Sequence, residues 1–362
     1  MSIEPTTNFK DSNGVDLGNK LVTKDYLISV YPEIGQQIGI PPELWIWGLG
    51  SNGRLGNAST TNVSTPVTTF AGGTNWKQVS CGDFHTAAIK TDGTLWTWGN
   101  GSDGRLGNES QLSTSTPVTT FAGGTNWKQV SAGGAHTAAI KTDGTLWTWG
   151  LRRFLGNATA YSPPAYISTP VTTFAGGTNW KQVSAARLHT AAIKTDGTLW
   201  TWGRTYNGSL GNADLYGGRS TPVTTFAGGT NWKQVSCGGY HTAAIKTDGT
   251  LWTWGLGGSG TLGNEVIGGT ISTPVTTFAG GNNWKQVSGG NRHTAAIKTD
   301  GTLWTWGNGL SGRLGNGISS FSINISTPIT TFAGGTNWKQ VIGGYDHTAA
   351  VQAGINAEYP LS

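Results

Sequence analysis

Histidine is the residue type in this chain best suited to general acid–base chemistry, and all six histidines stand in one recurring sequence, His-Thr-Ala-Ala. A general base works beside a nucleophile or beside a carboxylate that orients it. No such partner recurs at a variable position near these histidines, and six equivalent copies cannot each be a catalytic base. The pattern therefore predicts structural histidines bonded to backbone, in a protein that is not an enzyme. They are His85, His136, His189, His241, His293 and His347.

Two glycine-rich segments could cradle a phosphate, Gly-Ser-Asp-Gly at 101–104 and Gly-Gly-Ser-Gly at 257–260. Neither is followed by a helix or by the Lys-Ser/Thr pair of a phosphate loop. Cysteine and histidine do not occur at metal-ligand spacing. The sequence thus predicts no cofactor, no metal and no catalytic residue. A hydrolase or lyase with a single active site at the axial opening of the fold is the alternative.

Arginine and tyrosine have a distribution that points to recognition. All nine arginines lie in stretches that differ between otherwise similar copies of a repeat, whereas every lysine lies in the shared framework or in the first 24 residues. These two side chains dominate binding hot spots, although loops also tolerate random drift. Drift would place lysine there as readily as arginine, which favours a partner-binding surface. It would comprise Phe84, Arg152, Arg153, Phe154, Arg187, Leu188, Tyr206, Tyr240, Arg292 and Tyr345.

The framework that positions these residues is a repeat of about 52 residues, present six times between Leu44 and Gln352. In the first copy, alternation and β-branched residues predict strands over 65–70, 76–80, 85–90 and 95–98. The Thr-Asp-Gly-Thr sequence at 91–94 predicts a tight hairpin. Apolar residues occupy both faces of these strands, as in sheets covered on both sides by neighbours. We therefore expect an all-β fold, a β-propeller with four antiparallel strands in each blade.

The two ends of the repeat region predict how the ring closes. The sixth copy stops at Gln352 without a final strand, while the segment from Leu44 to Gly48 stands without the strands that should precede it. Pairing of Leu44 to Trp47 with His347 to Val351 would complete six blades and remove two exposed edges. Because strand direction alternates, the variable connections should gather on one face of the propeller.

The repeat resembles that of the regulator of chromosome condensation family: Trp-Gly, a variable stretch, Leu-Gly-Asn, a strand with proline, then Gly-x-x-His-Thr. The resemblance covers residues 43–352 and implies a propeller over 43–353, with 354–362 as a tail. Seven blades are usual in that family and stay open as an alternative here. The resemblance also implies an intracellular, cytoplasmic scaffold for protein interactions as an alternative function. Nucleosome binding is not expected, because residues 1–42 carry three lysines against five acidic residues instead of a basic tail.

The formal net charge of +5 comes without any run of Lys or Arg, so no nucleic-acid partner is expected. Nowhere do 18 apolar residues follow one another, so no membrane insertion is expected. The partner predicted for the variable surface is a protein or a glycan.

Residues 1–42 differ in composition and are predicted to be a docking segment with a linker. A short helix ending before Pro32 would present Val22, Tyr26, Leu27, Val30 and Tyr31 to the rest of the chain or to a neighbour. This opening resembles repeat proteins of marine tailed bacteriophages. That resemblance implies a virion component, attached to other virion proteins through residues 1–42 and displaying the propeller for host attachment. This is the principal functional prediction from the sequence.

Overall fold

A computed structural model of the chain describes residues 43–353, apart from 73–74, 159–162, 206 and 318–323. The predicted docking residues Val22, Tyr26, Leu27, Val30 and Tyr31 lie outside the described residues, as do Tyr206 and the predicted tail. Helices long and apolar enough to cross a membrane are absent from the described part.

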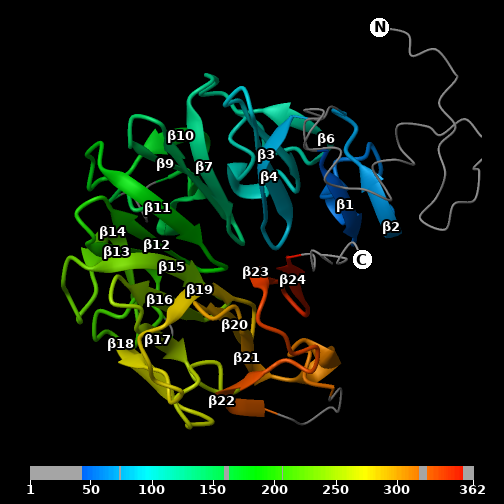
Figure 1. Ribbon diagram of the computed structural model, residues 1–362. Helices are drawn as coiled ribbons and strands as arrows, with labels where there is room; N and C mark the ends of the chain where they lie inside the picture. The colour runs from blue at the N-terminus through cyan, green and yellow to red at the C-terminus, as the bar shows by residue number, and fades with distance from the viewer. Residues whose placement is uncertain (1–42, 73–74, 159–162, 206, 318–323, 354–362) are drawn as a thin grey trace, which may run out of the picture. The chain divides into compact units, whose positions relative to one another are not determined.

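Five antiparallel sheets of four strands follow one another along the described part of the chain (Figure 1). In each sheet the strands begin, in order, at a tryptophan, at a histidine, at a leucine, and before a Thr-Pro sequence. The first sheet has β3 (Trp76–Cys81), β4 (His85–Lys90), β5 (Leu95–Gly99) and β6 (Thr114–Thr119). The second has β7 (Trp127–Ala132), β8 (His136–Lys141), β9 (Leu146–Leu151) and β10 (Tyr166–Thr172), and the third has β11 (Trp180–Ala185), β12 (His189–Lys194), β13 (Leu199–Arg204) and β14 (Gly218–Thr224). The fourth has β15 (Trp232–Cys237), β16 (His241–Lys246), β17 (Leu251–Leu256) and β18 (Thr270–Thr276), and the fifth has β19 (Trp284–Gly289), β20 (His293–Lys298), β21 (Leu303–Asn308) and β22 (Asn324–Thr330).

Two further pairs of strands lie at the ends of the described region. β1 (Trp45–Gly48) pairs with β2 (Val63–Thr68), and β23 (Trp338–Gly343) pairs with β24 (Thr348–Gln352). By sequence, β23 and β24 are the first two strands of a sheet and β1 and β2 the last two. The described residues thus hold five blades and two half-blades that correspond to a sixth. Within the residues that the structure describes, four short 3-10 helices lie in loops between third and fourth strands: η1 (Ser51–Gly53), η2 (Ser102–Gly104), η3 (Arg152–Phe154) and η4 (Leu310–Gly312).

The predicted closure pairing differs from the structure. Among the described strands, β1 pairs with β2 alone and β24 with β23 alone, so Leu44 to Trp47 are not paired with His347 to Val351. The pairs that form are local in sequence, whereas the predicted pair would join the two ends of the repeat region. The predicted grouping of strands into blades is also wrong by one strand. The sequence predicts that each Thr-Pro strand begins a blade, but in the structure it is the fourth strand of the preceding blade: β6 pairs with β5 across the long variable loop.

Neighbouring blades pack through apolar side chains on both faces of each sheet. Between the first two complete blades, Ala87, Ile89 and Leu95 contact Trp127, Val130 and Trp149. The leucine of each Leu-Gly-Asn sequence is also buried, so this part of the loop packs against blades instead of lying on a surface. These leucines are Leu55, Leu106, Leu155, Leu210, Leu262 and Leu314. The prediction that both faces of the strands are covered is confirmed.

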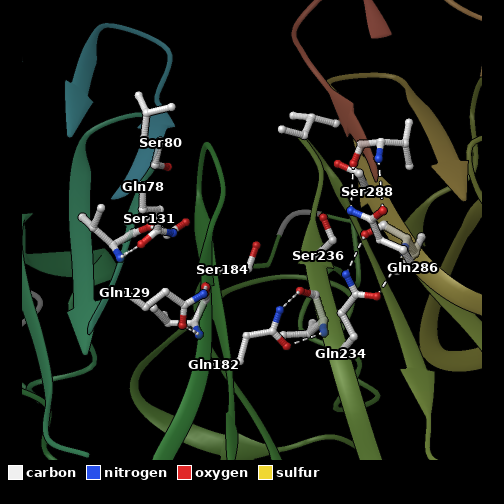
Figure 2. A pocket seen from close by; sticks show the side chains of 17 residues that line it. Gln78, Ser80, Gln129, Ser131, Gln182, Ser184, Gln234, Ser236, Gln286 and Ser288 are labelled. Atoms are coloured by element: carbon white, nitrogen blue, oxygen red, sulfur yellow. Dashed lines mark hydrogen bonds between the residues drawn. The ribbon is translucent and has the colours of Figure 1, made fainter. Parts of the chain in front are cut away.

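The first strand of each blade faces a central channel with its unpaired backbone edge. From β7 onward, a glutamine from the preceding blade caps that edge. Gln78 Nε2 donates to the Val130 carbonyl at 3.2 Å, and the Val130 amide donates to Gln78 Oε1 at 3.0 Å. Ser80 Oγ accepts from the Ala132 amide at 2.9 Å. Figure 2 shows the glutamine and serine side chains around the channel, where they line a cavity of about 260 Å³. The same glutamine bonds link Gln129 to Val183, Gln182 to Val235, Gln234 to Val287, and Gln286 to Val341.

Replacing one of these glutamines should weaken a single interface between blades. Gln182→Ala removes both bonds to Val235, and water in the channel compensates in part, so we expect a loss of about 2 kcal/mol in unfolding free energy. Urea unfolding followed by tryptophan fluorescence measures it. Lys181→Ala, at the exposed neighbouring position, is the control. Equal unfolding midpoints for the two variants would contradict the role given to the glutamine.

Candidate recognition face

A hydrogen-bond network between blades fixes the loops at one end of the strands. The Arg105 carbonyl accepts from Thr137 Oγ1 at 2.8 Å and from Trp149 Nε1 at 2.9 Å, both in the next blade. Thr137 Oγ1 lies 2.7 Å from His85 Nε2. Because the threonine proton goes to the carbonyl, the histidine donates from Nε2. The carbonyls at Arg54, Phe154, Ser209 and Thr261 accept an indole and a threonine hydroxyl in the same way.

Five of the histidines, His85, His136, His189, His241 and His293, are therefore structural, as predicted, although the partner of each ring is a threonine hydroxyl and not the backbone. His347 is exposed. Burial is the main cause that lowers the pKa of His136, His189 and His293 to about 3 and that of His241 to about 4. Burial likewise lowers the pKa of His85 well below its usual value. Such weak bases accept protons poorly near neutral pH. Groups of three or more His, Cys, Asp or Glu placed to hold a metal ion are absent from the described residues.

The five lowered pKa values predict unfolding by acid. The unfolded chain binds protons at these histidines near pH 6.5 and the folded chain does not, so stability is complete above that pH. It falls as the pH drops from 6.5 toward 3, by about 1.4 kcal/mol per pH unit for each histidine. Circular dichroism during acid titration should show cooperative unfolding within this range. His241→Asn, if it folds, should shift the midpoint to lower pH; an unchanged midpoint would contradict this account.

The variable connections meet at one end of the strands. The loop between third and fourth strands touches the loop before each histidine: Arg54 Nη1 donates to the Asp83 carbonyl at 2.7 Å, and Arg105 Nη1 donates to the Gly134 carbonyl at 2.8 Å. We call this end of the blades, with residues 82–84 and their equivalents, the variable face. The predicted gathering of variable loops is confirmed.

The opposite end of the blades carries the connections that barely differ between copies. The Thr91 amide donates to the Asn75 carbonyl at 2.7 Å, and the Trp127 amide donates to the Gly93 carbonyl at 3.0 Å. The hairpin at 91–94 therefore lies beside Asn75 and Trp127, at the ends of the connections that lead into the first strands of two blades. We call this end, with its equivalents in the other blades, the constant face.

Three arginines of the variable loops have a structural role. Arg105 is 5% exposed and Arg313 is 4% exposed. Each of Arg54, Arg105 and Arg313 donates from Nε to a carbonyl of its own loop. A guanidinium reaches two acceptors in fixed directions, which an ammonium group cannot reproduce. The preference for arginine over lysine at this position thus follows from loop structure, and it does not by itself indicate a partner.

Arg187 links another predicted recognition residue, Tyr240, to an aspartate that was not predicted, Asp83. Its Nη1 donates to Tyr240 Oη at 2.8 Å, and its Nε lies 3.7 Å from Asp83 Oδ2. Asp83 lies two blades away, and Gly134 stands between, where a Cβ would come within 3.1 Å of Asp83 Oδ2. Burial raises the pKa of Asp83, while Arg187, Arg105 and Arg54 act in the opposite direction.

The remaining predicted residues differ in accessibility. Phe84 is 41% exposed, and the Arg54 and Arg105 guanidinium carbons each lie 5.5 Å from its ring centroid. Phe154 is the exception, because it is 2% exposed and packs on His136; it supports the surface from below and cannot contact a partner directly. Arg153, Arg292 and Tyr345 are exposed, and Arg152 and Leu188 are half-buried.

Sequence reasoning missed Asp83 and the supporting roles of Arg54 and Arg105. A signal for the arginines was available, since the residue before Leu-Gly-Asn is arginine in three of the six copies. Asp83 had no such signal, because its partner comes from two blades further along and no other copy repeats the pair.

Comparison with known proteins gives the family. The profile of the RCC1-like domain matches residues 43–357. The chain belongs to this family. It is similar to the ultraviolet-B receptor UVR8 of Arabidopsis thaliana, with 33% identity over 76% of this chain and 63% of the receptor. It is also similar to the mitochondrial RCC1 domain-containing protein RUG3 of the same plant, with 31% identity over 76% of this chain and 64% of that protein. The chain thus spans a little under two thirds of these relatives.

Among solved structures, yeast RCC1 bound to Kap60 superposes with a TM-score of 0.73 and 21% identity, covering 86% of this chain and 77% of that one. At this identity the likeness shows the fold. The RCC1-type propeller implied by the sequence is confirmed, whereas the resemblance of residues 1–42 to phage proteins stays a prediction.

Proposed function

We propose that this RCC1-like protein is a noncatalytic scaffold that binds another protein through its variable face. The observation that carries the proposal is the contact of Arg187 with Tyr240, with Arg292 exposed on the corresponding loop of the next blade. These are side chains of hot-spot type on loops that a constant framework holds in place. The solved relative from yeast was captured with a protein, Kap60. The lowered pKa values of the buried histidines support the absence of acid–base catalysis.

Display of the same face on a virion, with a protein or glycan receptor, is the second candidate from the sequence. The relatives named above are a plant receptor, a mitochondrial plant protein and a yeast protein, so they favour the scaffold. Virion localisation stays a prediction, which mass spectrometry of purified particles would test.

The scaffold proposal predicts which surface captures partners. Changing Arg187, Tyr240 and Arg292 together to alanine should lower the amount of captured protein at least tenfold, because truncating hot-spot residues costs about 2 kcal/mol or more each. Quantitative mass spectrometry after affinity capture measures this. The matched control changes Lys77, Lys181 and Lys285 on the constant face to alanine. Equal capture by both variants would contradict the proposal. A thermal unfolding scan checks that each variant is folded.

We also propose that the two half-blades join as the sixth blade, since a scaffold needs its loops held on a closed ring. Trp47 is 58% exposed in the structure, whereas its five equivalents are fully buried. Each equivalent indole donates to the carbonyl before a Leu-Gly-Asn sequence. The matching Arg313 carbonyl accepts from Thr348 Oγ1 at 2.7 Å and has a second lone pair available for the Trp47 indole.

The pairing register follows from the complete blades. Thr86 lies opposite Trp98 and Ile89 opposite Leu95, so Thr348 would lie opposite Trp47 and Val351 opposite Leu44. Gln340 would then cap the backbone edge at Val79, as Gln78 caps Val130. The serine of the other copies is replaced by Ile342, so this interface would have one hydrogen bond fewer than the others.

Closure predicts a large effect of Trp47→Ala. In a closed ring the indole is buried, and its loss should cost about 3–5 kcal/mol, like Trp149→Ala in a complete blade. In an open ring the cost should stay within about 0.5 kcal/mol. Urea unfolding of the two variants distinguishes the cases, with Leu112→Ala as the exposed control. A Trp47→Ala variant as stable as Leu112→Ala would overturn closure.

A further inference from the structure

Six phenylalanines are exposed at equivalent positions, one for each repeat. Each follows a fourth strand and opens the connection to the next blade, so all six belong to the constant face. Their exposed fractions range from 59% to 84%. They are Phe70, Phe121, Phe174, Phe226, Phe278 and Phe332.

The neighbours of these phenylalanines have structural roles. In the second copy, Thr120 is 4% exposed, Ala122 packs into the core, and the Gly123 carbonyl accepts from Trp127 Nε1 at 2.9 Å. The Phe121 backbone amide donates to the Gly107 carbonyl, a bond that any residue except proline could make. The ring itself lies mostly in solvent. The fold therefore explains the backbone at this position and leaves the aromatic side chain unexplained.

Exposed positions of the variable face change from copy to copy, whereas those of the constant face barely change. The loops of the variable face differ in every copy, yet the exposed aromatic ring is present in all six. Exposed apolar side chains gathered on one face mark contact with a partner or with a membrane. The six rings belong to equivalent connections of successive blades, so they recur at the same level along the blades. This arrangement fits a broad, flat partner better than a groove or a single peptide.

The charge of the constant face indicates the chemical class of the partner that it fits. Eleven lysines lie at this end of the strands, against five aspartates and Glu43. Six of the lysines are exposed: Lys77, Lys128, Lys181, Lys233, Lys285 and Lys339. The other five are held in place by aromatic rings, as Lys90 Nζ is by Trp76 and Trp96, at 4.9 and 4.7 Å from their centroids. Two such faces repel each other, which argues against a second copy of the chain as the partner.

We propose that the constant face binds the surface of an anionic phospholipid membrane. The phenylalanine rings enter the boundary between headgroups and acyl chains, and the exposed lysine ammonium groups contact lipid phosphates and carboxylates. Burial of apolar area and attraction to anionic lipids act together in this kind of peripheral association. A nucleic acid duplex would meet the lysines but would leave the phenylalanines without a role. This binding lies beyond the proposed scaffold function and uses the opposite face, so a protein partner and a membrane can be held together.

Co-sedimentation with vesicles tests the proposal on the full chain. We expect binding to phosphatidylcholine vesicles that contain about a third phosphatidylserine, much weaker binding to phosphatidylcholine alone, and loss of binding as salt is raised. Changing all six phenylalanines to serine should weaken binding to the anionic vesicles at least tenfold, as should changing the six exposed lysines to glutamine. The matched control changes Leu112, Tyr216 and Val266, exposed apolar residues of the variable loops, to serine and should bind as the parent does.

Two results would overturn the proposal. One is failure of the parent chain to sediment with anionic vesicles. The other is retention of binding by the phenylalanine variant, which would leave a purely electrostatic surface for polyanions and predicts competition by heparin. Circular dichroism confirms that each variant is folded. The Arg187, Tyr240 and Arg292 triple variant should bind vesicles normally, so failure of the scaffold proposal and failure of this one are distinguishable.

Discussion

The structure depends on how the innermost strand of each blade satisfies its open edge. An unpaired strand edge in the middle of a propeller exposes backbone amides and carbonyls that no further strand can reach. The side-chain amide of glutamine places an N–H donor beside a carbonyl acceptor, the same pair that a neighbouring peptide unit would present. Gln78 and its equivalents therefore act as one-residue strand partners from the preceding blade. The blades are thereby linked around the channel by polar bonds as well as by the packing of tryptophan and leucine.

The loops of the variable face can differ in sequence on this rigid framework, because the contact that orients each loop is made by a backbone carbonyl. The carbonyl before each Leu-Gly-Asn sequence accepts a hydroxyl from the next blade, and in five cases also an indole. The side chain at that position is free to differ, and it is arginine, phenylalanine, serine or threonine in different copies. At this position the Arg105 side chain hydrogen-bonds to a carbonyl of its own loop, while the Phe154 ring packs on the His136 ring. Loop sequence can thus change without loss of the network that orients the loop.

Much of the fold could be predicted from the sequence because the repeat makes the pattern visible six times. The strands, the Thr-Asp-Gly-Thr hairpins and the two covered sheet faces follow from local residue types. The assignment of each Thr-Pro strand to its blade does not follow from local residue types, because the pairing of β5 with β6 spans a loop whose length and composition vary. The location of the variable face could be predicted, but the contacts within it could not. The contact of Arg187 with Asp83 depends on the absence of a side chain at Gly134, a fact of three-dimensional packing.

The sameness of the glutamine bonds has a consequence for evolution. Since Gln129 meets Val183 as Gln234 meets Val287, the copies that carry both the glutamine and the serine can follow one another without a mismatched junction; the sixth copy has Ile342 in place of the serine. Recombination within the gene could then add or delete one of these copies and leave the glutamine bonds of the remaining junctions intact, while the number of blades and the curvature of the ring change. A lineage built this way can vary its number of blades in single steps, and new loop sequences can spread among positions by exchange between copies.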